Sequence, residues 1–144
     1  MHKVSYTDWS YVQIRSASGD PDERGLYAAR HIPRGTVIGC FDGRAAWFPI
    51  GPDGKLQTAP FAFKDLIQLE RQGDRVLALA PVDAFDGIDC VNHSCHANAE
   101  LKRGVVLVAR RAIKPGEEIL LDYRKMDVVP EGIQCWCAEP RCVI

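Results

Sequence analysis

The sequence predicts a mostly β protein that folds as one compact domain of short strands. Short apolar runs recur along the chain between Gly and Pro turns, which is typical of β structure. No segment carries the sustained periodicity of a long helix. At 144 residues the chain is long enough to bury a core without disulfides.

The expected strands follow from apolar runs bounded by turn residues. Gln72-Gly73-Asp74 is a typical hairpin turn between two such runs. A short helix over Lys64–Gln72 competes with the first of them, because its leucines and isoleucine would also share one helical face. The strands that we expect lie at Tyr11–Arg15, Leu26–Ala29, Thr36–Phe41, Leu66–Arg71, Arg75–Ala80, Val105–Arg110 and Ile119–Tyr123.

Two distant segments share one local pattern. Arg30–Ile38 and Arg111–Ile119 both read Arg-x-Ile-x-x-Gly-x-x-Ile, with a Pro in each turn. Two strand–turn–strand corners of one type would produce this echo, and so would chance. The shared segment is too short to be a solenoid repeat.

The charge balance limits the class of partner. The chain has 18 basic and 19 acidic residues, a net charge of −1. A protein that coats nucleic acid needs a basic excess, so we expect no direct nucleic-acid partner. No apolar run approaches the roughly 18–20 residues of a membrane span, and the first residues lack the apolar core of a signal peptide. We therefore expect an intracellular protein without a membrane segment.

The placement of the six cysteines is more informative than their number. Cys135, Cys137 and Cys142 crowd together near the end of the sequence. In a reducing compartment such a cluster favours metal ligation over disulfides. A structural zinc site needs four ligands, so either Cys95 or Cys90 would supply the fourth. The alternative is three unrelated, reduced cysteines at a frayed terminus.

Two further segments are candidates for chemistry. Asp89–Asn98 contains two His, two Cys and two Asn, and forms either a polar turn that bonds its own backbone or a site rich in donors and acceptors. Gly116–Tyr123 reads as a turn and a buried strand that ends in an aromatic residue.

Together and in this order, the three motifs resemble the SET-domain protein lysine methyltransferases. The motifs are Asn92-His93-Ser94-Cys95, then Gly116-Glu117-Glu118 through Asp122-Tyr123, then Cys-x-Cys-x-x-x-x-Cys. Arg24–Ala28 looks like that family's first cofactor-contacting strand, and the resemblance runs from about Ser16 to Cys142. It implies a SET-domain fold of several short β-sheets with a C-terminal pseudoknot over residues 1–128, followed by a zinc-binding post-SET segment over 129–144.

The resemblance also implies the site. It assigns catalysis to Tyr123, one structural zinc to the protein, and methyl transfer from S-adenosylmethionine to a lysine of a protein or peptide, a histone or another basic protein, docked as an added strand. Whether the protein is a monomer or a homodimer stays open. The implied residues are Arg24, Gly25, Leu26, Tyr27, Asn92, His93 and Trp136 for the cofactor, Phe41, Tyr123 and Trp136 for the substrate channel, and Cys95, Cys135, Cys137 and Cys142 for the metal.

Some positions depart from the family pattern. Glu23 occupies the first Gly of a Gly-x-Gly, Phe41 replaces a tyrosine, and Asp89-Cys90 stands where an Arg-Phe pair is usual. These departures motivate a second hypothesis, a catalytically weak or inactive SET-like, zinc-containing peptide-binding module. A third is a thiol redox protein that uses Cys135 and Cys137. We expect the two unassigned cysteines, Cys40 and Cys90, to be small buried hydrophobes.

Overall fold

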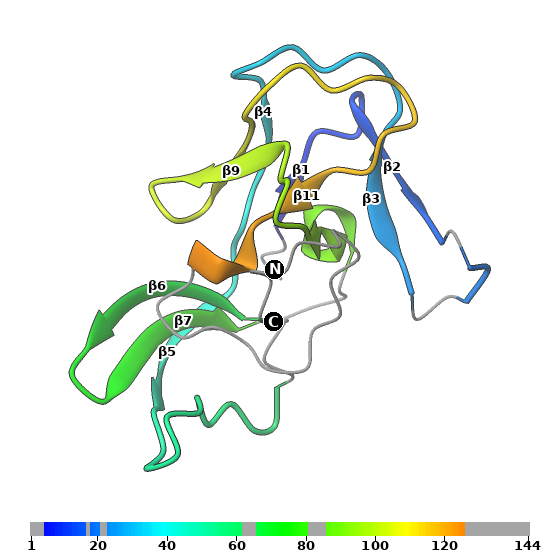
Figure 1. Cartoon of the computed structure of the whole chain (residues 1–144). Helices are drawn as coiled ribbons and strands as arrows, with labels where there is room; N and C mark the ends of the chain where they lie inside the picture. Colours follow the sequence, from blue (N-terminus) through cyan, green and yellow to red (C-terminus); the bar gives the residue numbers. More distant parts are fainter. Residues whose placement is uncertain (1–4, 17, 21–22, 62–65, 81–85, 126–144) are drawn as a thin grey trace.

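The computed structural model describes residues 5–16, 18–20, 23–61, 66–80 and 86–125, and within them the chain consists of short strands and 3-10 turns (Figure 1). The strands are β1 (Tyr6–Thr7), β2 (Val12–Arg15), β3 (Gly25–Ala28), β4 (Val37–Cys40), β5 (Arg44–Pro49), β6 (Ile67–Gln72), β7 (Arg75–Ala80), β8 (Asn92–His93), β9 (Ala99–Lys102), β10 (Val106–Ala109) and β11 (Leu120–Leu121). The 3-10 turns are η2 (Gly87–Cys90) and η3 (Tyr123–Lys125).

The strands form several small sheets instead of one large one. An antiparallel sheet has the order β1-β4-β10-β9, and a second, of order β5-β7-β6, lies beside it in the lower part of Figure 1. β2 pairs with β3 in an antiparallel ladder, whereas β8 and β11 form a parallel pair. The fold is therefore mostly β, as the sequence predicts.

The two segments with the shared pattern pair with each other. Ile32 and Ile113 exchange both backbone hydrogen bonds at 2.9 Å. The N–H of Gly35 donates to the carbonyl of Ala109, and at the matching position of the other segment Gly116 donates to Ala28, both at 2.8 Å. The shared pattern therefore marks two corners of one type that pair with each other through their backbones. Both isoleucines are fully buried.

Two apolar clusters stabilise the described residues. The main cluster lies between the sheets and includes Leu26, Ile38, Ile88, Leu107 and Ile119, all fully buried. The second belongs to the β5-β7-β6 sheet, where alternation along β7 turns Val76, Ala78 and Ala80 to one buried face. The β5-β7-β6 sheet therefore has a small core of its own, formed by residues that lie between Phe41 and Ile88 in the sequence.

Six of the expected strands are confirmed with small shifts of their ends, whereas Ile119–Tyr123 is strand only over Leu120–Leu121, and Tyr123 begins η3. The strand interpretation holds over Ile67–Gln72, so the competing helix is wrong there, and Gly73 has the positive φ of 60° that the hairpin turn requires. Four strands were not predicted, β1, β5, β8 and β9. No helix among the described residues has the length and apolar character to cross a bilayer.

The corner pairing leads to a first prediction. We expect Ile32→Ala and Ile113→Ala each to lower the free energy of unfolding by about 2–5 kcal/mol, because each opens a cavity in a fully buried site. Urea denaturation measures the change. Val37→Ala, at an exposed position of β4, is the control and should change it by less than about 0.5 kcal/mol. A loss under about 1 kcal/mol at both isoleucines would contradict the role given to the pairing.

Candidate active site

The polar segment Asn92–Asn98 is held against the strand that leads to Tyr123. Asn92 pairs with Leu120 and His93 with Leu121 in the parallel β8–β11 ladder. Asn98, 2% exposed, continues this contact through its side chain. Its Nδ2 donates to the carbonyl of Glu118 at 2.8 Å, and its Oδ1 accepts from the N–H of Leu120 at 2.9 Å. Sequence positions about 20 to 30 apart therefore meet in one place.

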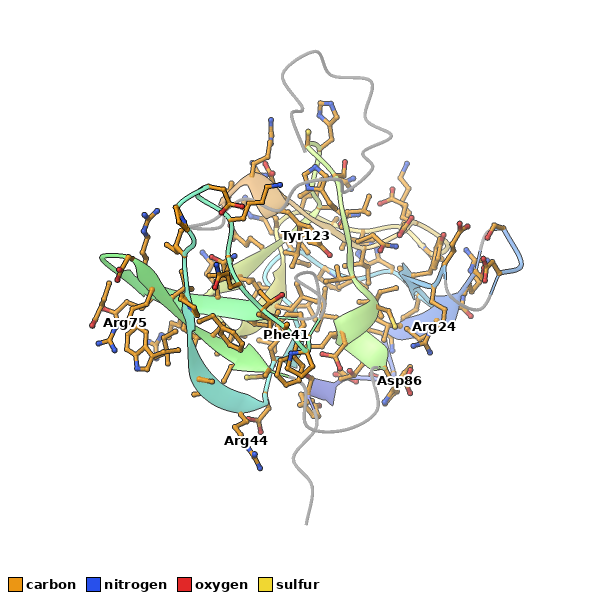
Figure 2. The ribbon with its side chains drawn as sticks, turned by 90° about the horizontal axis from the view of Figure 1, so that it is seen from below. Arg24, Phe41, Arg44, Arg75, Asp86 and Tyr123 are labelled. Carbon is orange, nitrogen blue, oxygen red and sulfur yellow. The ribbon has the colours of Figure 1, made fainter. Side chains whose placement is uncertain are left out.

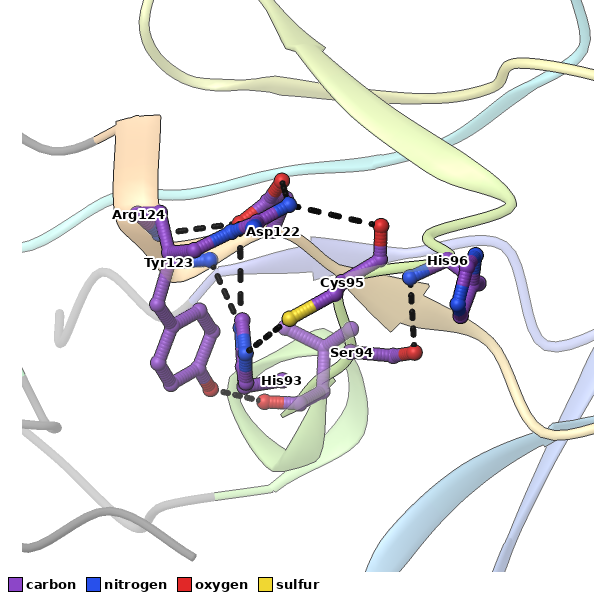
Figure 3. Close-up of polar contacts among 8 residues, drawn as sticks. His93, Ser94, Cys95, His96, Asp122, Tyr123 and Arg124 are labelled. Atoms are coloured by element: carbon purple, nitrogen blue, oxygen red, sulfur yellow. Dashed lines mark hydrogen bonds and ion pairs between the residues drawn. The ribbon is translucent and has the colours of Figure 1, made fainter. Parts of the chain in front are cut away.

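His93 and Tyr123 form the centre of this arrangement (Figure 3). The Nδ1 of His93 accepts a hydrogen bond from the backbone N–H of Tyr123 at 2.9 Å, and the two rings lie 5.4 Å apart. The Tyr123 hydroxyl donates to the carbonyl oxygen of Val91. Because the imidazole is buried, its pKa is lowered, and this outweighs the opposing effect of the Asp122 carboxylate. His93 is therefore a neutral acceptor at neutral pH.

A charged pair borders the two rings. Arg124 binds Asp122 through two side-chain hydrogen bonds of 2.9 and 2.8 Å. These bonds hold the pKa of the Asp122 carboxyl below its usual value, so the group is ionised. The same guanidinium lies 3.5 Å from the carbonyl of Cys95. The pair thus connects η3 to the segment after β8.

A second group of polar atoms surrounds Gly25, at the start of β3. The Nδ2 of Asn92 donates to the Glu118 carboxylate at 2.9 Å and to the carbonyl of Arg24 at 3.2 Å. A Cβ atom on Gly25 would lie 2.6 Å from Glu118 Oε2 and 3.2 Å from Asn92 Nδ2, so only glycine leaves these groups where they are. The Tyr27 hydroxyl is 3.5 Å from the same carboxylate. Partial burial and this carboxylate raise the pKa of Tyr27.

The other residues expected at the site are placed as follows. Arg24 is half-exposed and lies 3.8 Å from Asp86, and the two side chains are adjacent in Figure 2. Leu26 is fully buried and its carbonyl accepts from Ile119, so its groups face the core. Phe41 and Tyr123 belong to the same buried cluster. Trp136 lies outside the described residues.

Of the four expected zinc ligands, the structure describes Cys95. Its sulfur is 3.7 Å from Nε2 of His93, and the residue is partly exposed. Cys90, the other candidate for a fourth ligand, is 3% exposed, and burial raises the pKa of its thiol. Cys135, Cys137 and Cys142 lie outside the described residues. Within the described part of the chain, no three His, Cys, Asp or Glu residues gather as a metal site would need.

Glu118 also belongs to this site, although its sequence motif assigned it no role. Its carboxylate contacts both Asn92 and Tyr27, and it occupies the space that a side chain at position 25 would need. The signal in the sequence was the second acidic residue of Gly116-Glu117-Glu118, directly before an apolar strand. That Glu118 lies next to Gly25 depends on the isolated bridge between Tyr27 and Glu118, which local patterns do not predict.

Comparison with known families agrees with this geometry. The SET domain matches residues 23–124, more than half of the chain, and this range contains both polar groups described above. The chain belongs to the SET-domain family. Membership is consistent with the mostly β architecture and with the expectation drawn from the Asn92–Cys95 and Gly116–Tyr123 motifs.

Several curated histone-lysine N-methyltransferases are similar to this chain. Histone-lysine N-methyltransferase ash1 of Drosophila melanogaster is 42% identical over 66 residues, which cover 39% of this chain and 3% of that protein. A histone-lysine N-methyltransferase, H3 lysine-4 specific, of Mycosarcoma maydis is 28% identical over 90% of this chain and 9% of its own length. An H3 lysine-36 specific enzyme of Cryptococcus neoformans is 24% identical over 99% of this chain and 18% of its own length. The chain thus spans less than a fifth of each relative.

The position of His93 leads to a second prediction. We expect His93→Ala to lower the free energy of unfolding of this SET domain by about 2–4 kcal/mol, because it leaves the buried N–H of Tyr123 without an acceptor and opens a cavity beside the ring. His31→Ala, at an exposed position of the first corner, is the matched control and should change it by less than about 0.5 kcal/mol. If urea denaturation shows the same change in unfolding free energy for both variants, the structural role given to His93 is wrong.

Proposed function

We propose that this protein transfers a methyl group from S-adenosylmethionine to the side chain of a lysine in a protein substrate. The observation that carries the proposal is the convergence of Tyr123, His93 and the Gly25–Asn92–Glu118 group in a chain that belongs to the SET-domain family. When bound, the cofactor supplies an electrophilic methyl group on a sulfonium. The residues of the chain bind, orient and shield the reactants.

The groups around Gly25 fit a cofactor that carries an ammonium, a carboxylate and a sulfonium. Gly25 has no side chain, and the Glu118 carboxylate lies where positive charge would be stabilised. Asn92 is exposed, and its amide offers both a donor and an acceptor. We assign cofactor binding to Arg24, Gly25, Tyr27, Asn92 and His93, and we add Glu118. Leu26 and Trp136 complete the set that the family resemblance implies.

Tyr123 is the residue to which we assign catalysis. Because its hydroxyl proton is directed to the carbonyl of Val91, the phenol oxygen presents its lone pairs to other partners. A phenol has a reference pKa of about 10 and is a weak base at neutral pH. The oxygen therefore orients the amine and the methyl group instead of removing a proton.

The reacting lysine must be neutral, although its reference pKa is about 10.4. Phe41 and Tyr123 both belong to an apolar, buried cluster. A lysine side chain that enters among such residues loses hydration, which disfavours the ammonium form. We propose that these two residues and Trp136 line the substrate channel.

We further propose that residues 129–144 form a post-SET segment that binds one structural zinc, following the SET domain at 1–128. The proposed ligands are Cys95, Cys135, Cys137 and Cys142. Two observations support Cys95 over Cys90 as the long-range ligand. Cys95 is partly exposed whereas Cys90 is buried, and Nε2 of His93 lies within reach of its sulfur, where an N–H would stabilise a thiolate.

The names of the relatives suggest where to look for a substrate. Two of those compared are specific for H3 lysine-4 and H3 lysine-36, respectively. We propose a lysine in a histone or another basic protein, and histone H3 is the first substrate to test.

The function leads to a third prediction, for the isolated full chain with zinc and labelled S-adenosylmethionine. We expect methyl transfer to histone H3 or to a protein lysate. Tyr123→Phe should reduce the rate by roughly 10²–10³-fold, because it removes an oriented oxygen from the reacting centre. Binding of the cofactor, measured by calorimetry, should change much less.

The matched control is Tyr11→Phe, since no hydrogen bond of the Tyr11 hydroxyl is described and the substitution is otherwise the same. It should retain full activity. Thermal unfolding of both variants separates a loss of chemistry from a loss of fold. An active Tyr123→Phe protein would refute the role of Tyr123. A wild-type chain that binds the cofactor and methylates no protein would support the non-catalytic module.

A fourth prediction concerns the metal. We expect one zinc per chain by atomic emission, and Cys95→Ser should lower the zinc content and the affinity by at least about 10-fold, because it removes a proposed ligand. Cys40→Ser is the matched control and should leave the content at one. A zinc-free wild-type protein that cycles one disulfide would instead indicate the thiol redox function.

A further inference from the structure

The joined corners carry a group of exposed cationic side chains. The members of this group, which we name the corner surface, are Arg30, Arg34, Arg110, Arg111 and Lys114, with His31 beside them, and each is exposed. They come from the two segments that share the Arg-x-Ile-x-x-Gly-x-x-Ile pattern and from the residue before the second of them.

The backbone pairing brings these residues to one end of the molecule. The loop before β4 and the loop after β10 run side by side at the top of Figure 1. Hydrogen bonds between Ile32 and Ile113, and between Gly35 and Ala109, fix the two loops to each other. The cations of both loops therefore share a rigid base.

Few acidic groups offset this charge. Arg111 lies 3.2 Å from the Glu117 carboxylate, and the guanidinium of Arg30 lies over the ring of Tyr11. Among the residues that the structure describes, no ion pair involves Arg34, Arg110 or Lys114. The corner surface contains five of the 18 basic residues and none of the 19 acidic ones, which leaves 13 basic and 19 acidic residues, Glu117 among them, for the rest of the chain. The molecule is thus strongly asymmetric although its net charge is near zero.

The corner surface extends toward the candidate active site. An open hollow of about 380 Å³ is lined by Cys95, His96, Ala97, Arg110 and Arg111. The backbone N–H of Arg110 donates to the carbonyl of Asn98, the last residue of the polar segment that also contains His93. A polyanion on this surface would therefore lie next to the site without occupying the Gly25 group.

We propose that the corner surface binds the phosphodiester backbone of duplex nucleic acid. Four of its five fixed charges are guanidinium groups, which bind phosphate oxygens in a bidentate manner. An acidic protein segment is the other source of negative charge, but protein interfaces depend on buried aromatic and aliphatic anchors. The exposed large apolar side chain next to these loops is Val37, at the margin.

The side chains of the corner surface also favour a duplex over a single strand. Single strands bind where bases stack on exposed aromatic rings, and the aromatic ring described at this surface, Tyr11, is covered by Arg30. Contacts to a duplex backbone need cations alone. The near-zero net charge still argues against a protein that coats nucleic acid, since the acidic remainder of the chain would be repelled. One oriented contact is compatible with it, although the charge of the whole chain led us to expect no direct nucleic-acid partner.

Fluorescence anisotropy of a labelled, random-sequence duplex DNA tests the proposal with the full, zinc-containing chain and without S-adenosylmethionine. We expect a Kd of roughly 10⁻⁴–10⁻⁶ M that weakens steeply with salt, with a slope of log K against log salt of about −3 to −4.5 for the three to five cations involved. The double variant Arg34→Glu with Lys114→Glu should weaken binding by at least about 10-fold and reduce the slope by about 2.

A control with the same change in net charge is Arg44→Glu with Arg71→Glu, at two exposed positions of the β5-β7-β6 sheet, which carries none of the corner-surface residues. It should weaken binding by less than about 3-fold, because distant exposed charges are screened. Equal losses in both variants, or no DNA binding by the wild type, would overturn the proposal. Binding of polyglutamate in preference to DNA would indicate an acidic protein partner and would also overturn it.

Methyl transfer to a free peptide separates this proposal from the proposed enzyme function. The corner variants should methylate the peptide as the wild type does, since neither residue belongs to the active site. A chain that methylates peptides and does not bind DNA refutes the corner surface alone. A chain that binds DNA through Arg34 and Lys114 and methylates nothing refutes the enzyme function alone.

Discussion

The parallel contact between β8 and β11 is the constraint on which the candidate site depends. Two residues on each strand make this ladder, and such a short pair is weak by itself. The side-chain amide of Asn98 extends it by binding Glu118 and Leu120 on the opposite segment. Because Nδ2 and Oδ1 of Asn98 are buried, the loss of either hydrogen bond would cost the full desolvation penalty of that polar group. One asparagine thus keeps His93 next to Tyr123 and Asn92 next to Glu118.

The site combines two different electrostatic environments. The rings of His93 and Tyr123 are buried, desolvation lowers the pKa of the imidazole, and the Asp122–Arg124 pair lies at their border. Around Gly25 the Glu118 carboxylate is partly exposed and fills the space that a side chain at position 25 would take. Two desolvated rings beside a carboxylate suit the proposed reaction, in which a cationic donor meets an amine that must lose its proton.

The sequence predicted the local structure where a physical signal was local. β6 and β7 are apolar runs on either side of the Gly73 turn, so both strands were expected, and in the structure β7 turns every second residue to a buried face. β8 was not expected, because Asn92 and His93 are polar and their strand exists only through pairing with a distant apolar strand. β1 is equally short, and its pairing with β4 carries no periodic signal.

The residues of the candidate site also divide into those that the sequence predicted and those that it did not. Tyr123, His93 and Asn92 were named through a resemblance of motifs, since no periodicity relates residues 30 positions apart. Glu118 received no role because its contact with the Gly25 region is made across the fold. The matching patterns around Ile32 and Ile113 could have arisen from two corners of one type or from chance. The reciprocal hydrogen bonds between the two segments favour two corners of one type. Charge counted over the whole chain concealed the local excess of cations that this repeat creates.

The long reach of these contacts has a consequence for how the protein folds. The β5-β7-β6 sheet and its apolar cluster are formed by one continuous stretch of sequence, so they have low contact order and little loop-closure entropy to overcome. In contrast, Thr7 bonds Ile88, 81 positions away, and Arg15 bonds Gly116, 101 positions away. During synthesis β3 and β4 can pair early with β2 and β1, but their other partners, β10 and residues 117–119, are made much later. In that interval their unpaired edges are the part of the nascent chain most exposed to wrong pairing and aggregation.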